Sequence, residues 1–120
     1  MKSFNSQQVL VLATALLVLC TSCSTSANVD QAVSAQLKAE SEAKLGCAIW
    51  NEANLIKPAG STDELNARYP SLSHFAGAAR LDIRFLDLSF AAQQYFETEF
   101  FAGPRPNYYK VEAYCFGVTR

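Results

Sequence analysis

Few side chains in this sequence could carry out chemistry, and none of them forms a known catalytic pattern. His74 is the only histidine, and no cluster of cysteines or carboxylates stands near it at the spacing that a zinc site needs. The acidic pairs Asp82/Asp87 and Glu97/Glu99 would not share a helix face well, so they are predicted to be solvated charges. Phosphate-cradling glycine patterns and the Gly-x-Ser-x-Gly turn of serine hydrolases are also missing. The sequence therefore predicts no enzyme, no metal and no cofactor.

The size and charge of the chain narrow the class of protein further. With 120 residues, of which 50% are hydrophobic, the chain has room for one folded domain. Its 10 Lys and Arg residues nearly balance its 11 Asp and Glu residues, and no run of basic residues occurs. Nucleic-acid binding requires basic groups that neutralise phosphates. We therefore expect no nucleic-acid partner.

The N-terminus has the three parts of a secretory signal. Lys2 lies in a short polar lead, an apolar stretch runs from Val9 to Leu19, and small residues follow. The apolar stretch is shorter than the roughly 20 residues that span a membrane. Residues 1–27 are therefore predicted to be a signal peptide and residues 28–120 a single exported domain, located in the cell envelope or secreted.

This signal offers two cleavage sites. Thr25-Ser26-Ala27 fits the rule of small residues before an ordinary cleavage, which would start the mature chain at Asn28. Thr21-Ser22-Cys23 follows a leucine-rich core and resembles the lipobox of bacterial lipoproteins, although Cys20 stands where an aliphatic residue is usual. The resemblance implies cleavage before Cys23, which would then carry acyl chains and anchor the protein to a membrane.

Either cleavage leaves two cysteines in the folded domain. Cys20 and Cys23 are removed or lipidated, so Cys47 and Cys115 remain. In an oxidising compartment such a pair most simply forms a disulfide, and the alternative is two buried thiols. The bond would close a loop of about 69 residues, for which loop entropy contributes about 4 kcal/mol of stability.

The first part of the domain is predicted to be helical. Residues 29–54 are rich in Ala, Gln, Glu and Lys and contain no proline. Pro58 and Gly60 end this helix, Ser61 and Glu64 match a capping box for the next one, and Pro70 is placed to start another. Helical spacing predicts an apolar stripe made of Val33, Leu37, Leu45, Ala48, Ile49 and Ile56, with Cys47, Trp50 and Asn54 on its flank.

The second part allows two interpretations. Two neighbouring apolar stripes predict one long helix over residues 72–101, and residues 108–118 also have helical spacing. Alternation with period two leaves strands near 81–90 and 108–118 as the alternative. We therefore predict an all-α fold, a small bundle of three to four helices stapled by its disulfide. An α+β fold is the alternative.

Aromatic side chains supply the predicted binding surface. Trp and Tyr rings bury much area at low entropic cost and keep a polar tip, so they are frequent where one surface recognises another. Trp50, Tyr108 and Tyr109 form this surface, and the alternative is that the rings fill the core. The leading functional prediction is a non-enzymatic envelope protein that binds an unknown envelope protein or ligand. Its alternative is a carrier that encloses a lipid or haem in an aromatic-lined apolar cavity between helices.

Overall fold

The computed structural model describes the backbone of residues 2–101 and 103–118 and the side chains of residues 28–101 and 103–118. The chain divides into two units, Met1–Ser34 and Ala35–Arg120. The first unit consists of the N-terminal part of helix α1 (Lys2–Ala53). The predicted signal peptide, its cleavage sites and Cys23 lie outside the residues whose side chains are described, so they stay predictions.

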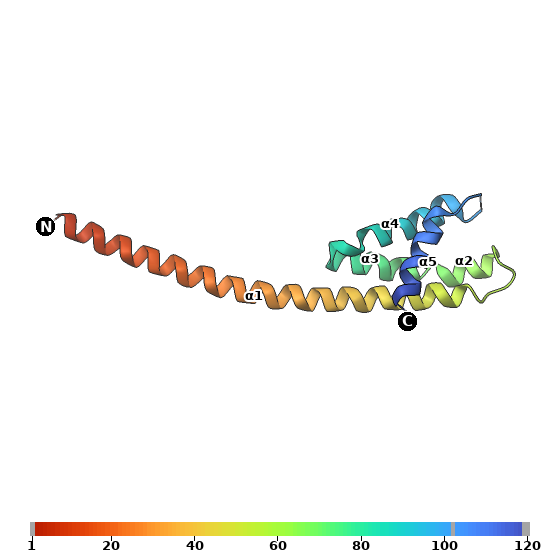
Figure 1. Cartoon of the computed structure of the whole chain (residues 1–120), viewed down its shortest axis with the longest axis horizontal. Coiled ribbons are helices and arrows are strands. Elements are labelled where there is room, and N and C mark those ends of the chain that lie inside the picture. The colour runs from red at the N-terminus through yellow and green to blue at the C-terminus, as the bar shows by residue number, and fades with distance from the viewer. Residues whose placement is uncertain (1, 102, 119–120) are drawn as a thin grey trace. The chain divides into compact units, whose positions relative to one another are not determined.

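The second unit is made of helices (Figure 1). After the end of α1 come α2 (Thr62–Arg68), α3 (Ser71–Leu81), α4 (Leu86–Gln94) and α5 (Pro106–Val118). A 3-10 turn (Ile83–Phe85) separates α3 from α4, and a π-helical turn (Tyr95–Glu99) follows α4. Residues 2–101 and 103–118 contain no strand. The predicted all-α bundle is therefore confirmed, and the strands considered for 81–90 and 108–118 are excluded.

The long helix predicted over residues 72–101 is wrong, because the chain leaves the helical conformation at Asp82. The backbone of Asp82 is extended, with φ −150° and ψ 119°, and its carboxylate accepts a hydrogen bond of 3.0 Å from the amide of Arg84. A short acidic side chain that caps the following turn competes with the helical hydrogen bonds. The break lets α4 turn back and pack against α3.

The start of α2 follows the predicted capping signal with one difference. The Ser61 hydroxyl accepts a hydrogen bond of 3.2 Å from the amide of Glu64, as predicted. The Glu64 carboxylate accepts from the amide of Gly60 and not from that of Ser61. Gly60 has a φ of 80°, which a residue without a Cβ adopts at little cost. Pro70 stands at the start of α3, as its position predicted.

The face of α1 that enters the core is not the predicted one. The predicted stripe is largely exposed, and Leu37 for example has 63% of its surface accessible. The buried face instead carries mostly small residues, namely Ala39, Ala43, Gly46, Cys47, Trp50 and Ala53. A Cβ added at Gly46 would lie 2.6 Å from a ring carbon of Phe75. At Gly46, α3 approaches so closely that a side chain of any size would meet the ring of Phe75.

Candidate functional site

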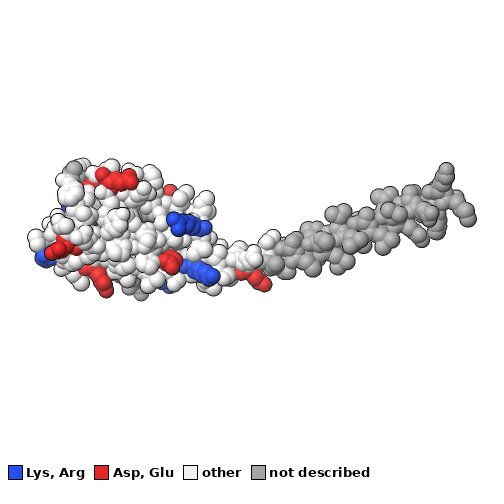
Figure 2. Space-filling view, turned by 180° about the vertical axis from the view of Figure 1, so that it is seen from behind, with Lys and Arg blue, Asp and Glu red and all other residues white. Residues whose placement is uncertain are grey.

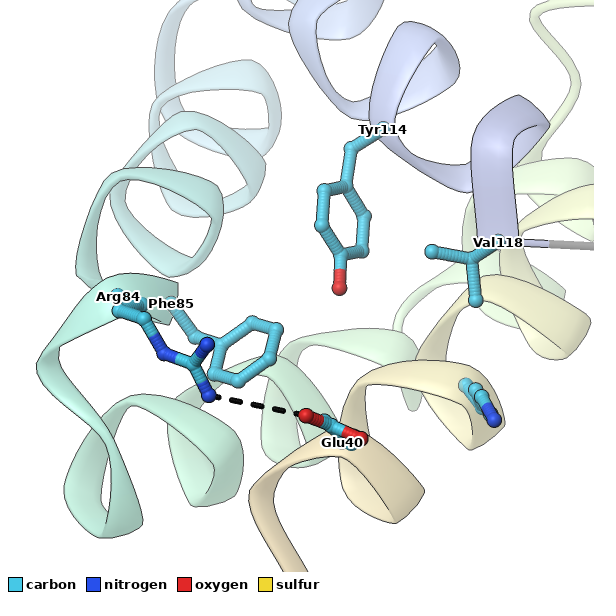
Figure 3. Close-up of a pocket in the computed structure, with 6 residues that line it drawn as sticks. Glu40, Arg84, Phe85, Tyr114 and Val118 are labelled. Atoms are coloured by element: carbon cyan, nitrogen blue, oxygen red, sulfur yellow. Dashed lines mark ion pairs between the residues drawn. The ribbon is translucent and has the colours of Figure 1, made fainter. Parts of the chain in front are cut away.

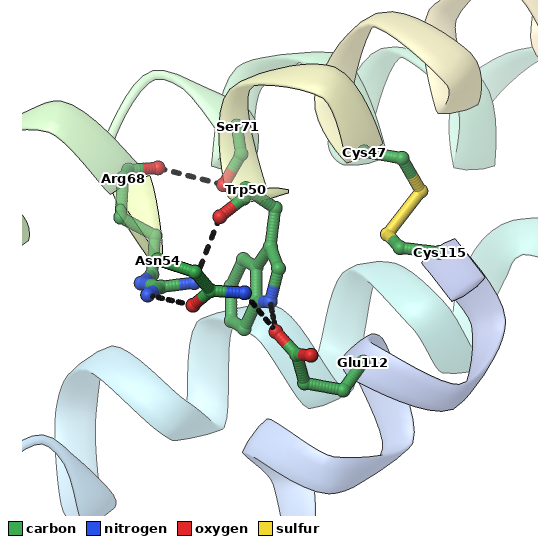
Figure 4. Close-up of a disulfide and its surroundings, with 7 residues drawn as sticks. All are labelled: Cys47, Trp50, Asn54, Arg68, Ser71, Glu112 and Cys115. Atoms are coloured by element: carbon green, nitrogen blue, oxygen red, sulfur yellow. Dashed lines mark hydrogen bonds between the residues drawn. A yellow bond between two sulfur atoms is a disulfide. The ribbon is translucent and has the colours of Figure 1, made fainter. Parts of the chain in front are cut away.

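The disulfide joins α1 to α5. Cys47 and Cys115 are bonded, both are fully buried, and their Cα atoms lie 5.1 Å apart (Figure 4). This confirms the pairing predicted from the cysteine count. The bond holds the C-terminal helix against the helix that carries Trp50, one turn from Cys47.

Trp50 lies at the centre of the core, which corrects its assignment to a binding surface. Its side chain is wholly buried. Four rings surround it at centroid distances between 5.3 and 6.4 Å, those of Phe75, Tyr95, Phe96 and Tyr108. The indole Nε1 donates a hydrogen bond of 2.7 Å to Glu112 on α5 (Figure 4). Trp50 therefore joins elements of the fold and presents nothing to a partner.

A buried arginine stacks on this tryptophan. The Arg68 guanidinium lies 4.4 Å from the Trp50 ring centroid, and the side chain is fully buried. It donates hydrogen bonds to the Trp50 carbonyl at 3.2 Å, to Asn54 Oδ1 at 2.7 Å and to Glu64 Oε1 at 2.8 Å. The sequence did not predict this buried arginine. The one sequence feature that indicates it is the spacing of Glu64 and Arg68, which stand four residues apart and can therefore pair on a helix.

Asn54 extends this network to α5. Its amide nitrogen donates to Glu112 at 2.7 Å, and its carbonyl oxygen accepts from the Tyr108 hydroxyl at 3.0 Å. Burial, followed by the nearby charge of Glu112, raises the pKa of Tyr108 to about 12. Tyr108 is thus half-buried and belongs to the interior more than to a surface. These hydrogen bonds connect the end of α1 with α2 and α5. We use the name Arg68 cluster for the residues that form them, namely Trp50, Asn54, Glu64, Arg68, Tyr108 and Glu112.

Two further polar residues have roles that the sequence did not predict. Glu99 is buried, not solvated, and its carboxylate accepts from the amides of Asn107 at 2.9 Å and Tyr108 at 3.1 Å. It thereby caps the N-terminus of α5, where a negative charge is favourable. His74 is partly exposed, and its Nδ1 lies 2.7 Å from Glu42 Oε2. The described residues contain no group of three or more potential metal ligands.

Exposed rings lie on either side of the loop between the π-helical turn and α5. Tyr109 is 66% exposed, and its ring contacts the ring of Tyr108 at 5.5 Å. Phe101 is 86% exposed, and its ring contacts that of Phe100 at 4.7 Å. Tyr108 and Phe100 both contact the buried ring of Tyr95, at 5.4 and 5.9 Å. Each exposed ring is therefore one contact away from the core.

Two surface pockets are present in the described part of the second unit. The first, which we call the α1–α5 pocket, has a volume of about 410 Å³ and is shown in Figure 3. It is lined by Glu40, Lys44, Arg84, Phe85, Tyr114 and Val118. The second, between α3 and α4, has a volume of about 390 Å³ and is lined by Tyr69, Leu72, Ala76, Ser89, Gln93, Phe96 and Glu97.

The charged side chains on one face of the molecule lie in small groups (Figure 2). On the face drawn in Figure 2, acidic and basic side chains are interspersed, and uncharged residues cover most of the area between them.

Within the described part of the chain, no helix has the length and apolar character to cross a membrane. No protein-family model, curated protein or solved structure matches this chain.

Proposed function

We propose that this chain is an exported cell-envelope protein that binds another envelope protein through exposed aromatic side chains, with Tyr109 and Phe101 as its anchors. One observation carries this proposal. The core is filled by aromatic rings, and the exposed rings of Phe101 and Tyr109 contact Phe100 and Tyr108, which pack in or against that core. Large rings held rigidly lose little entropy on binding, which makes them effective anchors in an interface.

The packing of the core favours this function over that of a lipid or haem carrier. Such a carrier needs an apolar cavity between its helices. The space between α1, α3 and the π-helical turn is occupied by Trp50, Phe75 and Tyr95, all fully buried. The two pockets described above lie at the surface and have mixed polar and apolar walls.

The disulfide supports export. Disulfides form and persist in oxidising compartments and are rare in the cytosol. The bond between Cys47 and Cys115 is fully buried and links the helices that frame the domain. The signal-like residues 1–27 point to the same compartment.

Site-specific crosslinking in cells tests the binding surface. With p-benzoylphenylalanine in place of Tyr109, light should produce one discrete adduct between the chain and a partner protein. Phe90 on α4 is a matched control position, because it is 61% exposed but has no ring contact to the core among the described residues. An adduct at position 90 with none at 109, or no adduct at either, would contradict the proposed surface.

We further propose that Cys23 carries the acyl chains that anchor the protein. Replacing Cys23 by serine should abolish the incorporation of an alkyne-labelled fatty acid. The matched Cys20→Leu variant should keep that label, because it retains Cys23 and places an aliphatic residue where lipoboxes usually have one. The label is the proper measurement, since an uncleaved signal would also hold the variant in the membrane. Labelling that persists in Cys23→Ser and disappears in Cys20→Leu would show that the anchor is elsewhere.

A further inference from the structure

We infer that the α1–α5 pocket is a binding site for a small zwitterion with an apolar body, such as an apolar amino acid. This site shares no residue with the proposed protein-binding surface, so either can fail without the other. Its volume of about 410 Å³ falls in the range of roughly 300–1,000 Å³ that small-molecule pockets occupy.

One wall of the pocket is apolar and rigid. The Phe85 side chain is almost fully buried, and its ring meets that of Tyr114 edge to face at 6.1 Å. Val118 extends this wall at the end of α5 (Figure 3). The nearby disulfide at Cys115 fixes α5 relative to α1. An aromatic or aliphatic body of about one side chain in size would rest here and lose contact with water.

The polar groups of the pocket carry both signs of charge. Glu40 and Lys44 stand one turn apart on α1, so their side chains are neighbours on the helix surface. Arg84 is already held by Asp82, with its Nη2 at 2.6 Å and its Nε donating at 2.8 Å, and it reaches Glu40 only at 3.7 Å. Asp82 does not line the pocket but balances the charge of Arg84, which leaves Glu40 and Lys44 as one charge of each sign. A ligand with one charge of each sign is therefore complementary to the pocket.

Three polar side chains that line the pocket can form further hydrogen bonds, namely Glu40, Lys44 and Tyr114. Lys44 forms no hydrogen bond or ion pair with any described residue, and Glu40 accepts no hydrogen bond from one. The Tyr114 hydroxyl points into the pocket (Figure 3) and likewise donates to no described residue. Burial, followed by the charge of Glu40, raises the pKa of Tyr114, so its hydroxyl keeps its proton. A ligand ammonium would bind Glu40, and a ligand carboxylate would accept from Lys44 and Tyr114.

Titration of the full chain with three matched probes tests this site. L-Phenylalanine carries both charges, 3-phenylpropionate lacks the amine, and 2-phenylethylamine lacks the carboxylate. In nuclear magnetic resonance spectra, L-phenylalanine should shift the amides of Phe85, Tyr114 and Val118 until they saturate. Each singly charged probe should bind about tenfold more weakly, because one charge-assisted hydrogen bond is missing. Equal binding of L-phenylalanine and 3-phenylpropionate, or shifts that do not saturate, would overturn the proposal.

Variants assign the effect to the pocket. Lys44→Gln and Glu40→Gln should each weaken the binding of L-phenylalanine about tenfold. Lys38→Gln removes an exposed charge from the same helix outside the pocket and should leave the affinity unchanged. A loss in Lys38→Gln as large as that in Lys44→Gln would overturn the assignment. Crosslinking at position 109 should persist in Lys44→Gln, which separates a failure of this site from a failure of the protein-binding surface.

Discussion

Replacing Cys47 by serine is expected to lower the free energy of unfolding by about 4 kcal/mol. The disulfide to Cys115 spans a sequence separation of 68 residues, so its loss restores the entropy of a long loop to the unfolded chain. That loss is comparable with the whole stability of a marginal domain, roughly 5–15 kcal/mol. Urea unfolding followed by circular dichroism measures the difference.

The reduced protein is the control for this prediction. The unsubstituted chain in excess dithiothreitol should be destabilised as much as Cys47→Ser, and the reductant should not destabilise the variant further. After denaturation without reductant, the variant should show one more reactive thiol than the unsubstituted chain, because Cys115 is then free. Equal stability of the oxidised and reduced chains would contradict the prediction.

The features of the fold that could be predicted from the sequence are those set by local chemistry. The capping serine at 61 and the proline at 70 mark helix starts that depend on a few neighbouring atoms. The pairing of Cys47 with Cys115 followed from counting, since the other two cysteines fall in the region predicted to be a signal peptide. None of these inferences needed the packing of one helix on another.

The buried face of α1 could not be predicted because it depends on the partner helix. Hydrophobicity alone selects Leu37 and Leu45 over Ala43 and Gly46, yet the first two are exposed. The helices of this bundle approach so closely at Gly46 that its neighbour, Phe75, fills the space where a side chain would stand. The close approach of α3, and not the hydrophobicity of the residues alone, therefore selects the buried face of α1. This approach depends on both helices, so the sequence of α1 alone does not indicate it.

The positions of the candidate site residues also depended on packing that the sequence does not show. Of the rings assigned to the binding surface, Tyr109 is exposed and Trp50 is buried, because a large ring with one polar tip suits an interface and a core equally well. Arg68 and Glu99 were missed because a single charged residue in a sequence is usually solvated. Their burial depends on partners distant in sequence, the carbonyl of Trp50 and the amides at the start of α5.

Replacing Arg68 by methionine is expected to cost about 3–5 kcal/mol of stability, because it removes one partner of a buried ion pair. Methionine keeps much of the length of the side chain but leaves the buried carboxylate of Glu64 without its opposite charge. It also removes the cation that stacks on Trp50. Urea unfolding near neutral pH measures the loss. Arg80→Met, an exposed change on α3, should alter stability by less than about 0.5 kcal/mol.

The pH dependence shows whether the Glu64 charge is the cause of this loss. Burial alone would raise the pKa of Glu64, but the hydrogen bond from Gly60 and the hydrogen bond and charge of Arg68 lower it below its usual value of 4.5. Because the folded pKa is depressed, this carboxylate stabilises the fold above about pH 4.5 and loses that contribution as the pH falls. Arg68→Met removes two of the lowering causes, so its deficit relative to the unsubstituted chain should shrink between neutral pH and about pH 3. A deficit that stays constant over that range would show that the lost stability comes from packing around Trp50 and not from the pair with Glu64.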